Sequence, residues 1–443
     1  MGLLLSYYGD DFTGSTDVME SLSLHGIDTV LFTRIPSDDE LQRFSACRAI
    51  GIAGTSRSQP PEWMDEHLPR YFRWLKDRGA QFCHYKVCST FDSSPTVGSI
   101  GKAIEIGRNV FGQKLTPLVV GAPQLKRYTA FGHLFAGYQG QTYRIDRHPV
   151  MSRHPVTPMD EADLRIHLSR QTNIPTALIP VNLLNGDNSS AVDAIAASHD
   201  GIVLFDVLDA ATQIETGRQL LMRADTTGPF IVGSSGVNYA LARAWAEIGT
   251  VSGRSNFPPL KPVDRIMAVS GSCSPTTARQ IRHALASGFT GIEADPLALA
   301  GVDGIIEIRR LAAMSIGHLQ EGRSVIVYTA LDPENDKGVA LDRIPGGRHL
   351  VGEALGAIAR DAIKSCHLRR AILAGGDTSS HALGQLDVFA LTLRFPLKAT
   401  PGSPLCTAHS SNLKLDGLEI AMKGGQVGLD DYFVSLRDGG LKG

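Results

Sequence analysis

Short apolar runs alternate with longer amphipathic segments through the first half of the chain. The first unit is an apolar run at 3–8, the polar turn Gly9-Asp10-Asp11, and an amphipathic run at 16–24 that ends before Gly26. Further apolar runs at similar spacing occur at 29–32, 49–53, 118–121, 177–180 and 202–206. This alternation predicts buried strands joined by helices, which is typical of a Rossmann-like parallel sheet.

The pattern is interrupted at residues 250–262, which are rich in Ser, Gly and Pro and have no periodicity. Beyond this linker, strands are predicted at 266–270, 324–329 and 371–374, each followed by a helical segment. The tail at 386–432 has short runs that indicate antiparallel strands. We therefore predict an α/β fold of two domains: a Rossmann-like parallel sheet in residues 1–255, and an α/β domain with additional antiparallel strands in residues 262–443.

Composition narrows the class of partner. The 443 residues are 43% hydrophobic with a formal net charge of -2, so no broad positive field favours nucleic acid or an anionic membrane. No apolar segment approaches the ~18 residues of a membrane span, and the start lacks the basic region of a secretory signal. Six cysteines give neither a disulfide framework nor a paired zinc motif. We predict a cytoplasmic protein that binds a small molecule, with no dedicated metal-ligand set; a homodimer is a possible assembly.

Two adjacent acids, Asp10 and Asp11, follow the first predicted strand. Ligands of parallel sheets bind at this edge, where strands end and helices begin. Neighbouring carboxylates repel each other unless hydroxyls, a cation or free helix N–H groups engage them. A polyhydroxylated ligand meets that need, so both acids are candidate substrate-binding residues. The structural alternative is a helix N-cap formed by Asp11 or Thr13.

Residues 85–95 combine Lys86, a run of hydroxyl side chains and Asp92, and a glycine-containing helix start follows them. Such a segment offers many donors to an anion. Arg57 follows the strand predicted at 49–53 and is a candidate for bidentate carboxylate binding. The ordinary explanations are a capped, Ser-rich loop and a lone surface arginine.

His148 and His154 lie six residues apart, with Asp146 nearby. The prolines that follow each histidine prevent the helical spacing of a two-histidine ligand pair, and no HExxH motif occurs. A rigid polar loop that reaches a neighbouring domain or subunit is the preferred interpretation.

Three turns in the second half combine glycine with hydroxyl or charged residues, at 270–274, 375–380 and 423–428. Glycines let backbone N–H groups close on phosphate oxygens, so three such turns together predict a nucleotide site. Asp377, in the second turn, is available to Mg²⁺ or to water around it. The chain has no GxxxxGK[ST] loop, no GxGxxG fingerprint and no HRD and DFG pair, so these general motifs identify no kinase class.

Over nearly its whole length the chain resembles the four-carbon acid sugar kinase family. The matching pieces, in family order, are GDDFTGSTD at 9–17, YKVCSTFDSSPTVGSIG at 85–101, RIDRHPVMSRHPVTPMDEADL at 144–164, GGDTS at 375–379 and KGG at 423–425. The resemblance implies an N-terminal sugar-binding domain and a C-terminal domain that binds ATP. It implies that the acid sugar contacts Asp11, Arg57, Lys86, Val87, Cys88 and Ser89. It implies ATP contacts at Ser270, Gly375, Gly376, Asp377, Thr378 and Gly425, and Gly424 joins them as part of the last glycine turn.

The chain departs from the family pattern at Gly9 and Ser15, where alanine is usual, and at Gly425-Gln426-Val427-Gly428, where Gly-Asn-Phe-Gly is common. Gly9 lies beside Asp10, so the first departure bears on which acid is bound. The candidates are 3-oxo-tetronate, threonate, erythronate and 3-oxo-isoapionate, a branched, oxidised acid that a related subgroup phosphorylates.

The expected reaction is in-line transfer of the γ-phosphoryl group from Mg-ATP to a terminal hydroxyl of the acid sugar. Arg57 and Lys86 are expected to hold the carboxylate, and the candidate catalytic acids are Asp11, Asp92 and Asp377. Two other classes stay open on the residues alone. One is a non-catalytic sensor that binds a sugar acid, and the other is a metal-dependent aldolase or hydrolase that uses His148 and His154.

Overall fold

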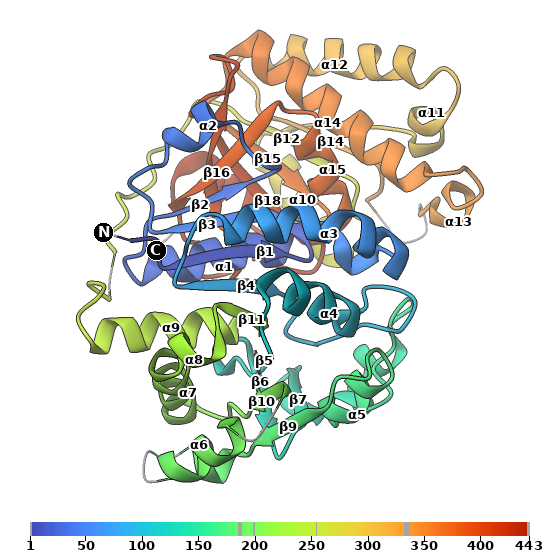
Figure 1. Ribbon diagram of the computed structural model, residues 1–443. Helices are drawn as coiled ribbons and strands as arrows, with labels where there is room; N and C mark the ends of the chain where they lie inside the picture. The colour runs from blue at the N-terminus through green and yellow to red at the C-terminus, as the bar shows by residue number, and fades with distance from the viewer. Residues whose placement is uncertain (1, 185–187, 198–199, 254, 332–335, 441–443) are drawn as a thin grey trace. The chain divides into compact units, whose positions relative to one another are not determined.

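The computed structural model describes residues 2–184, 188–197, 200–253, 255–331 and 336–440. The chain divides into two compact units, Met1–Ser255 and Asn256–Gly443 (Figure 1). Parallel strands with helical connections form the framework of each unit, and the second unit also has antiparallel strands. The predicted fold class is confirmed.

Within its described residues, the first unit contains eight parallel strands in the order β2-β3-β1-β4-β11-β5-β10-β9. The strands of this sheet are β1 (Leu5–Gly9), β2 (Thr29–Phe32), β3 (Ala49–Ala53), β4 (Phe82–Lys86), β5 (Leu115–Val119), β9 (Thr176–Ile179), β10 (Gly201–Phe205) and β11 (Phe230–Gly233). The helices are α1 (Phe12–Leu24), α2 (Asp38–Gln42), α3 (Pro61–Lys76), α4 (Ile100–Phe111), α5 (Leu164–Ser169), α6 (Ser189–Ala197), α7 (Ala210–Met222), α8 (Ala224–Thr227) and α9 (Gly236–Glu247).

The strand order places a topological switch point between β1 and β4. The connection from β1 leads to β2 on one side, whereas the connection from β4 leads to β5 on the other. Because such crossovers are right-handed, α1 and α3 cover opposite faces of the sheet. Helix α4 packs beside α3, and α9 packs beside α1. Ligands of open parallel sheets bind at the carboxyl edge of such a switch point.

Several features of this unit differ from the sequence prediction. The apolar pattern did not identify β4 or β11 as strands. The strand predicted at 118–121 runs three residues earlier, as β5, and includes Pro117, which aligns with Val203 of β10. Proline lacks a ladder N–H and is rare inside strands, so the pattern placed the strand after it. A separate antiparallel sheet, unpredicted, consists of β6 (Arg127–Ala130), β7 (His133–Tyr138) and β8 (Gln141–Arg144).

The second unit has the strand order β13-β14-β12-β15-β18-β17-β16. Its strands are β12 (Met267–Ser270), β13 (Thr290–Glu293), β14 (Val325–Tyr328), β15 (Arg370–Ala374), β16 (Val388–Phe395), β17 (Leu405–Ser410) and β18 (Glu419–Lys423). Its helices are α10 (Pro275–Ala286), α11 (Pro296–Ala300), α12 (Gly304–Gln320), α13 (Gly338–Leu341), α14 (Gly347–Cys366), α15 (Gly376–Gly384) and α16 (Tyr432–Asp438).

The tail prediction is partly correct. Strands β16 and β17 pair antiparallel, and β17 pairs antiparallel with β18, but β18 is parallel to β15. A second switch point lies between β12 and β15, whose outgoing connections lead in opposite directions.

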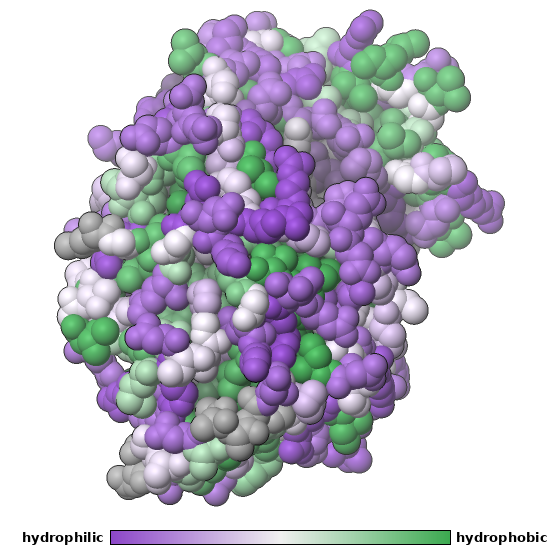
Figure 2. Space-filling model, viewed as in Figure 1, coloured by the Kyte–Doolittle hydropathy of each residue, from purple (hydrophilic) through white to green (hydrophobic). Residues whose placement is uncertain are grey.

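Polar side chains cover most of the surface seen in Figure 2, and exposed apolar residues occur in small groups. Within the described part of the chain, no helix is both long and apolar enough to cross a bilayer.

Candidate functional site

The first candidate site lies at the carboxyl ends of β1, β3 and β4. Gly9 aligns with Ala53 on one side and with Lys86 on the other. Beyond Gly9, the Asp10 N–H donates to the Lys86 carbonyl at 2.9 Å, and the Arg57 N–H donates to the Asp10 carbonyl at 3.0 Å. The sheet therefore brings together residues that are separated by 44 to 77 positions in sequence.

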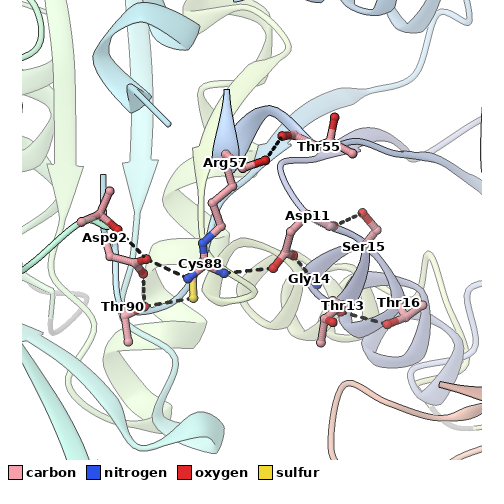
Figure 3. A network of polar contacts seen from close by, with 12 residues as sticks. Asp11, Thr13, Gly14, Ser15, Thr16, Thr55, Arg57, Cys88, Thr90 and Asp92 are labelled. Atoms are coloured by element: carbon pink, nitrogen blue, oxygen red, sulfur yellow. Dashed lines mark hydrogen bonds and ion pairs between the residues drawn. The ribbon is translucent and has the colours of Figure 1, made fainter. Parts of the chain in front are cut away.

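Arg57 connects two carboxylates across this edge (Figure 3). Its Nη1 donates to Oδ2 of Asp11 at 2.9 Å, and its Nη2 donates to Oδ2 of Asp92 at 2.8 Å. The Asp92 side chain is fully buried, whereas 29% of the Arg57 side chain is exposed. Burial alone would raise the pKa of Asp92, but the charge of Arg57 and the Thr90 hydroxyl lower it below the ordinary value. Thr157 adds a hydrogen bond to the same oxygen at 3.2 Å.

Asp11 has two roles. Its Oδ1 accepts from the Gly14 N–H at 2.6 Å and so caps α1, while its other oxygen contacts Arg57. The N-cap explanation is therefore correct for Asp11, and the acid still faces the candidate site. Asp10, next to it, is 4% exposed, and its Oδ1 has no hydrogen-bond partner among the described residues.

Lys86 is buried, and its ammonium group lies near the start of α1. A β-carbon built on Gly14 would come within 2.8 Å of the Lys86 Nζ. Buried Asp17 lies on the same helix and accepts a hydrogen bond from Ser235. Burial raises the pKa of Asp17, and Lys86 acts against that rise. Sequence reasoning did not select Asp17 or Ser235; Ser235 follows β11, a strand that the apolar pattern did not identify.

The residues that follow Lys86 differ in their exposure to solvent. Val87 is fully buried, and its N–H donates to the Gly233 carbonyl at 2.8 Å, so its side chain is a core residue. The Cys88 sulfur accepts from Thr90 at 3.0 Å, and both Cys88 and Ser89 are partly exposed. Of the predicted segment Lys86 to Ser89, the side chains of Cys88 and Ser89 are therefore the accessible ones.

The two histidines of the predicted polar loop stabilise their own turns. Nδ1 of buried His148 accepts from the N–H groups of Val150 and Met151, each at 3.2 Å, and Nδ1 of His154 accepts from the Thr157 N–H at 3.1 Å. No group of three or more His, Cys, Asp or Glu side chains suited to a metal ion occurs among the residues that the structure describes.

The second candidate site lies at the carboxyl ends of β12 and β15. Ser270 aligns with Ala374, and Ala374 aligns with Lys423 of β18, so the three glycine-containing turns leave neighbouring strands. A β-carbon on Gly271 would lie 2.5 Å from the Thr378 Oγ1, and one on Gly425 would lie 2.7 Å from the Ser272 Oγ. Gly375 has a φ of 110°, which side-chain-bearing residues rarely adopt. The three turns are therefore in mutual contact through glycine.

A cavity of about 340 Å³ opens between the first two turns. Its lining includes residues of the first two turns, namely Gly271, Ser272, Cys273, Gly375, Gly376 and Thr378, but not Ser270, Gly424 or Gly425. The sequence did not identify the other lining residues Pro296, Thr329, Ala330, Asp336, Lys337, Gly338, Leu341, Arg348 and Val351. Of these, Thr329 follows β14 and could have been found by its position after a strand. The Asp377 side chain lies outside the described residues; its backbone belongs to the first turn of α15.

Lys423 is buried behind the third turn. Its Nζ donates to the Thr277 Oγ1 and to the Gly424 carbonyl, both at 2.9 Å, and burial lowers its pKa to about 8. Thr277 in turn donates to the Gly425 carbonyl at 2.8 Å. These bonds fix the third turn against the start of α10.

The first unit also contains a larger cavity, of about 640 Å³, lined by residues such as Gln113, Leu115, Arg223 and Gly228. Leu115 begins β5 and Gly228 precedes β11, so this cavity lies at the amino edge of the parallel sheet. The acids and bases described above lie at the carboxyl edge of the same sheet, where ligands of open parallel sheets bind, so that edge is the better candidate.

Comparison with known proteins gives consistent matches to both units. Residues 5–241 match the sugar-binding N-terminal domain model, and residues 267–433 match the nucleotide-binding C-terminal domain model. The 3-oxo-isoapionate kinase of Paraburkholderia graminis is 46% identical over 100% of this chain and 96% of its own length. The 3-oxo-tetronate kinase of Pseudomonas fluorescens is 29% identical over 97% and 95%.

A solved structure from Salmonella typhimurium LT2 has the same fold, with a TM-score of 0.78, 22% identity and 98% coverage of both chains. Together with the two domain matches and the 46% identity along the full chain, this establishes that the chain belongs to the four-carbon acid sugar kinase family.

Proposed function

We propose that the protein is an ATP-dependent kinase that phosphorylates a terminal hydroxyl of a small acid sugar, and that this acid is 3-oxo-isoapionate. The observation that carries the proposal is the convergence of three glycine turns beside a cavity in the second unit. The choice of acid is supported by the relative with that substrate in its name, which is 46% identical, against 29% for a 3-oxo-tetronate kinase.

The residues of the two units supply complementary groups. Glycine turns and the N-terminus of α15 offer backbone N–H groups to phosphate oxygens, and Lys337 and Arg348 of the cavity add positive charge. In the first unit, Lys86 and Arg57 are cations suited to a carboxylate, and the acids beside them suit sugar hydroxyls. Mg²⁺ carried by ATP neutralises phosphate charge and needs only one or two protein carboxylates. Asp336 lines the cavity and is suited to that role, as is Asp377 by its position in the turn.

The proposal is tested by coupled ADP release with Mg-ATP and a panel of 3-oxo-isoapionate, 3-oxo-tetronate, threonate and erythronate. We expect the highest kcat/KM with 3-oxo-isoapionate, and mass spectrometry of the product should find one added phosphate. ATP consumption that is the same with and without every acid of the panel would contradict the proposal. Preference for 3-oxo-tetronate would retain the kinase and correct its substrate.

A variant of the glycine turns separates nucleotide binding from acid binding. In Gly271→Val the new β-carbon meets Thr378 at 2.5 Å, which forces the first two turns apart. We expect the KM for ATP to rise at least about tenfold, equivalent to about 1.4 kcal/mol, with the Kd for the acid unchanged. Gly384→Ala is the control. Gly384 ends helix α15, the helix that carries Thr378, and a β-carbon there meets nothing within 4 Å. Equal ATP affinity in both variants would remove these turns from the nucleotide site.

A cytoplasmic location and a homodimer are further proposals. Cell fractionation tests the location, and light scattering of the purified protein tests the assembly.

A further inference from the structure

Four buried or partly buried acids surround the carboxyl ends of β1 and β4, and three of them are engaged. Asp11 binds the Gly14 N–H and Arg57; Asp92 binds Arg57, Thr90 and Thr157; Asp17 binds Ser235. Asp10 differs from them. Its Oδ1 is inaccessible to solvent and makes no hydrogen bond to any residue in the described ranges.

The main chain of Asp10 is nevertheless held in place. The Asp10 N–H donates to the Lys86 carbonyl, and the Asp10 carbonyl accepts from the Arg57 N–H, so the main chain is bonded to both neighbouring segments. A buried polar group without a partner costs free energy, and native structures rarely retain one without a reason. A fixed backbone with an unsatisfied carboxyl at a switch point is the arrangement expected of a group whose partner is the ligand.

We propose that Asp10 is the general base that removes the proton from the acceptor hydroxyl; this inference rests on the proposed kinase function. In the step, the hydroxyl proton passes to the Asp10 carboxylate while the hydroxyl oxygen forms a bond to the γ-phosphorus. The bond from that phosphorus to the β,γ-bridging oxygen breaks, and its electron pair leaves with ADP. Arg57 and Lys86 are left to hold the carboxylate of the acid, because both cations lie beside Asp10 without bonding its side chain. This assignment replaces Asp11 and Asp92 as candidate bases, since Arg57 occupies an oxygen of each.

The charges around Asp10 suit a proton acceptor at neutral pH. Burial, followed by the charge of Asp11, raises the pKa of Asp10 to about 7, while Arg57 and Lys86 limit that rise. A base with a pKa near the working pH accepts and returns a proton most effectively. The ionisable groups that face Asp10 from the surrounding elements are Tyr8 on β1, Asp11 at the start of α1, Arg57 after β3, and Tyr85, Lys86 and Asp92 on and after β4.

The test compares Asp10→Asn with Asp206→Asn in the full-length protein. Asp206 is also buried, its pKa is also raised by burial, and it follows β10, but it binds the N–H groups of Gly132 and Val181. With Mg-ATP and 3-oxo-isoapionate, we expect Asp10→Asn to lose about 10²- to 10⁴-fold in kcat. Titration calorimetry should find the Kd for the acid and for a non-hydrolysable ATP analogue within about threefold of wild type, as near-equal binding in the ground state requires. Asp206→Asn should keep the wild-type kcat.

The pH profile adds a readout that a structural role would not move. The wild-type kcat/KM should fall tenfold per pH unit below pH ~7, and Asp206→Asn should retain this limb while the residual activity of Asp10→Asn loses it. A kcat within about threefold of wild type in Asp10→Asn, or an unchanged acid limb, would overturn the role of Asp10 and leave the kinase proposal standing. If Asp10→Asn does not fold, a flat wild-type profile from pH ~5.5 to ~8.5 overturns it instead. A wild-type protein that phosphorylates no acid overturns both proposals together.

Discussion

The Ser15 hydroxyl fills the space that a side chain at Gly9 would need: a β-carbon on Gly9 would lie 1.9 Å from the Oγ atom of Ser15. Ser15 is fully buried, and its hydroxyl donates to the Asp11 carbonyl at 2.6 Å. These are the two positions at which the chain departs from the alanine usual in its family. The absent side chain at residue 9 leaves the room that the Ser15 hydroxyl fills. The two departures are therefore one packing exchange within the fold.

The exchange predicts that one substitution costs less stability in a second background. Gly9→Ala alone should lower the free energy of unfolding by about 1–3 kcal/mol, because the added methyl overpacks against the Ser15 hydroxyl. In a Ser15→Ala background the same substitution should cost less, because the contact of 1.9 Å with Oγ is removed and the contact of 2.9 Å with the β-carbon of residue 15 remains. Urea denaturation of the two single variants and the double variant measures the coupling directly. Equal effects of Gly9→Ala in the two backgrounds would disprove the exchange.

The contacts of Arg57 predict that lysine cannot replace arginine at this position. Its fork reaches Asp11 and Asp92 from separate nitrogens, at 2.9 and 2.8 Å, which a single ammonium group cannot reproduce. Arg57→Lys should leave buried Asp92 without its close ion pair, lower the free energy of unfolding by about 1–3 kcal/mol and raise the KM for the acid at least tenfold. The estimate is reduced from the fully buried case because Arg57 is partly exposed.

The control for Arg57 is Arg34→Lys. Arg34 also forms a two-pronged ion pair, with Glu40 at 2.7 and 2.6 Å, but 56% of its side chain is exposed. Exposed pairs contribute about 1 kcal/mol or less, so both stability and KM should change little. If the two variants are equally stable and equally active, the buried network has no special role.

The sequence was sufficient to select the polar side chains of the first candidate site, but not to predict which of them are in contact. Asp11 and Arg57 were selected because they follow predicted strands, whereas Asp92 was selected because it lies with Lys86 in a hydroxyl-rich segment before a helix start. Their contact depends on the order β3-β1-β4, which one sequence does not contain, because the apolar pattern gives strands and not their neighbours. The same limit explains why the N-cap and ligand-binding roles of Asp11 were treated as alternatives, although its capping carboxylate also contacts Arg57 at the candidate site.

Asp10 could not be separated from Asp11 by sequence, since the two are adjacent and chemically identical. Only the structure distinguishes a carboxylate that caps a helix from one that no described group satisfies. The lining of the cavity in the second unit was likewise predicted only in part. Its glycine turns follow the recognisable strands β12 and β15, but Asp336 precedes α13 and Arg348 lies in the first turn of α14, so neither directly follows a strand.

The raised pKa of Asp10 predicts how the stability of Asp10→Asn depends on pH. The carboxyl ionises near pH 3.8 in the unfolded chain but at about 7 in the folded protein, so its protonation stabilises the fold at low pH and that stability is lost as pH rises toward 7. Asp10→Asn has no such loss. The free energy of unfolding of the variant minus that of wild type should therefore increase from pH ~4 to ~7.5, by on the order of 4 kcal/mol at most.

Asp92→Asn is the control with the opposite sign. The pKa of Asp92 is lowered in the folded protein, so its ionised form stabilises the fold above the unfolded pKa, and that stability is lost as pH falls. The difference between Asp92→Asn and wild type should therefore become more negative as pH rises toward ~4 and stay constant above that pH. Denaturant titrations of both variants at matched pH values would contradict the assignments if the two differences changed in the same direction.

Gly14→Ala predicts a loss of function without a loss of stability. Alanine is favoured over glycine inside a helix by about 1 kcal/mol, so substitution in α1 should stabilise the fold on backbone grounds. The new methyl, however, would lie 2.6 Å from the Asp11 Oδ1 and 2.8 Å from the Lys86 Nζ. Both are ends of side chains that can move aside, so the fold can absorb the contact, but the positions of the carboxylate and the ammonium group cannot be kept. We expect the melting temperature to stay within a few degrees of wild type while the KM for the acid rises at least tenfold, with the KM for ATP unchanged.

Gly317→Ala supplies the comparison, because Gly317 lies inside α12 and a β-carbon there meets nothing within 4 Å, so stability should rise with no kinetic effect. A Gly14→Ala protein with wild-type KM for the acid would mean that Lys86 and Asp11 do not set the geometry of acid binding, and the first candidate site would have to be placed elsewhere in the unit.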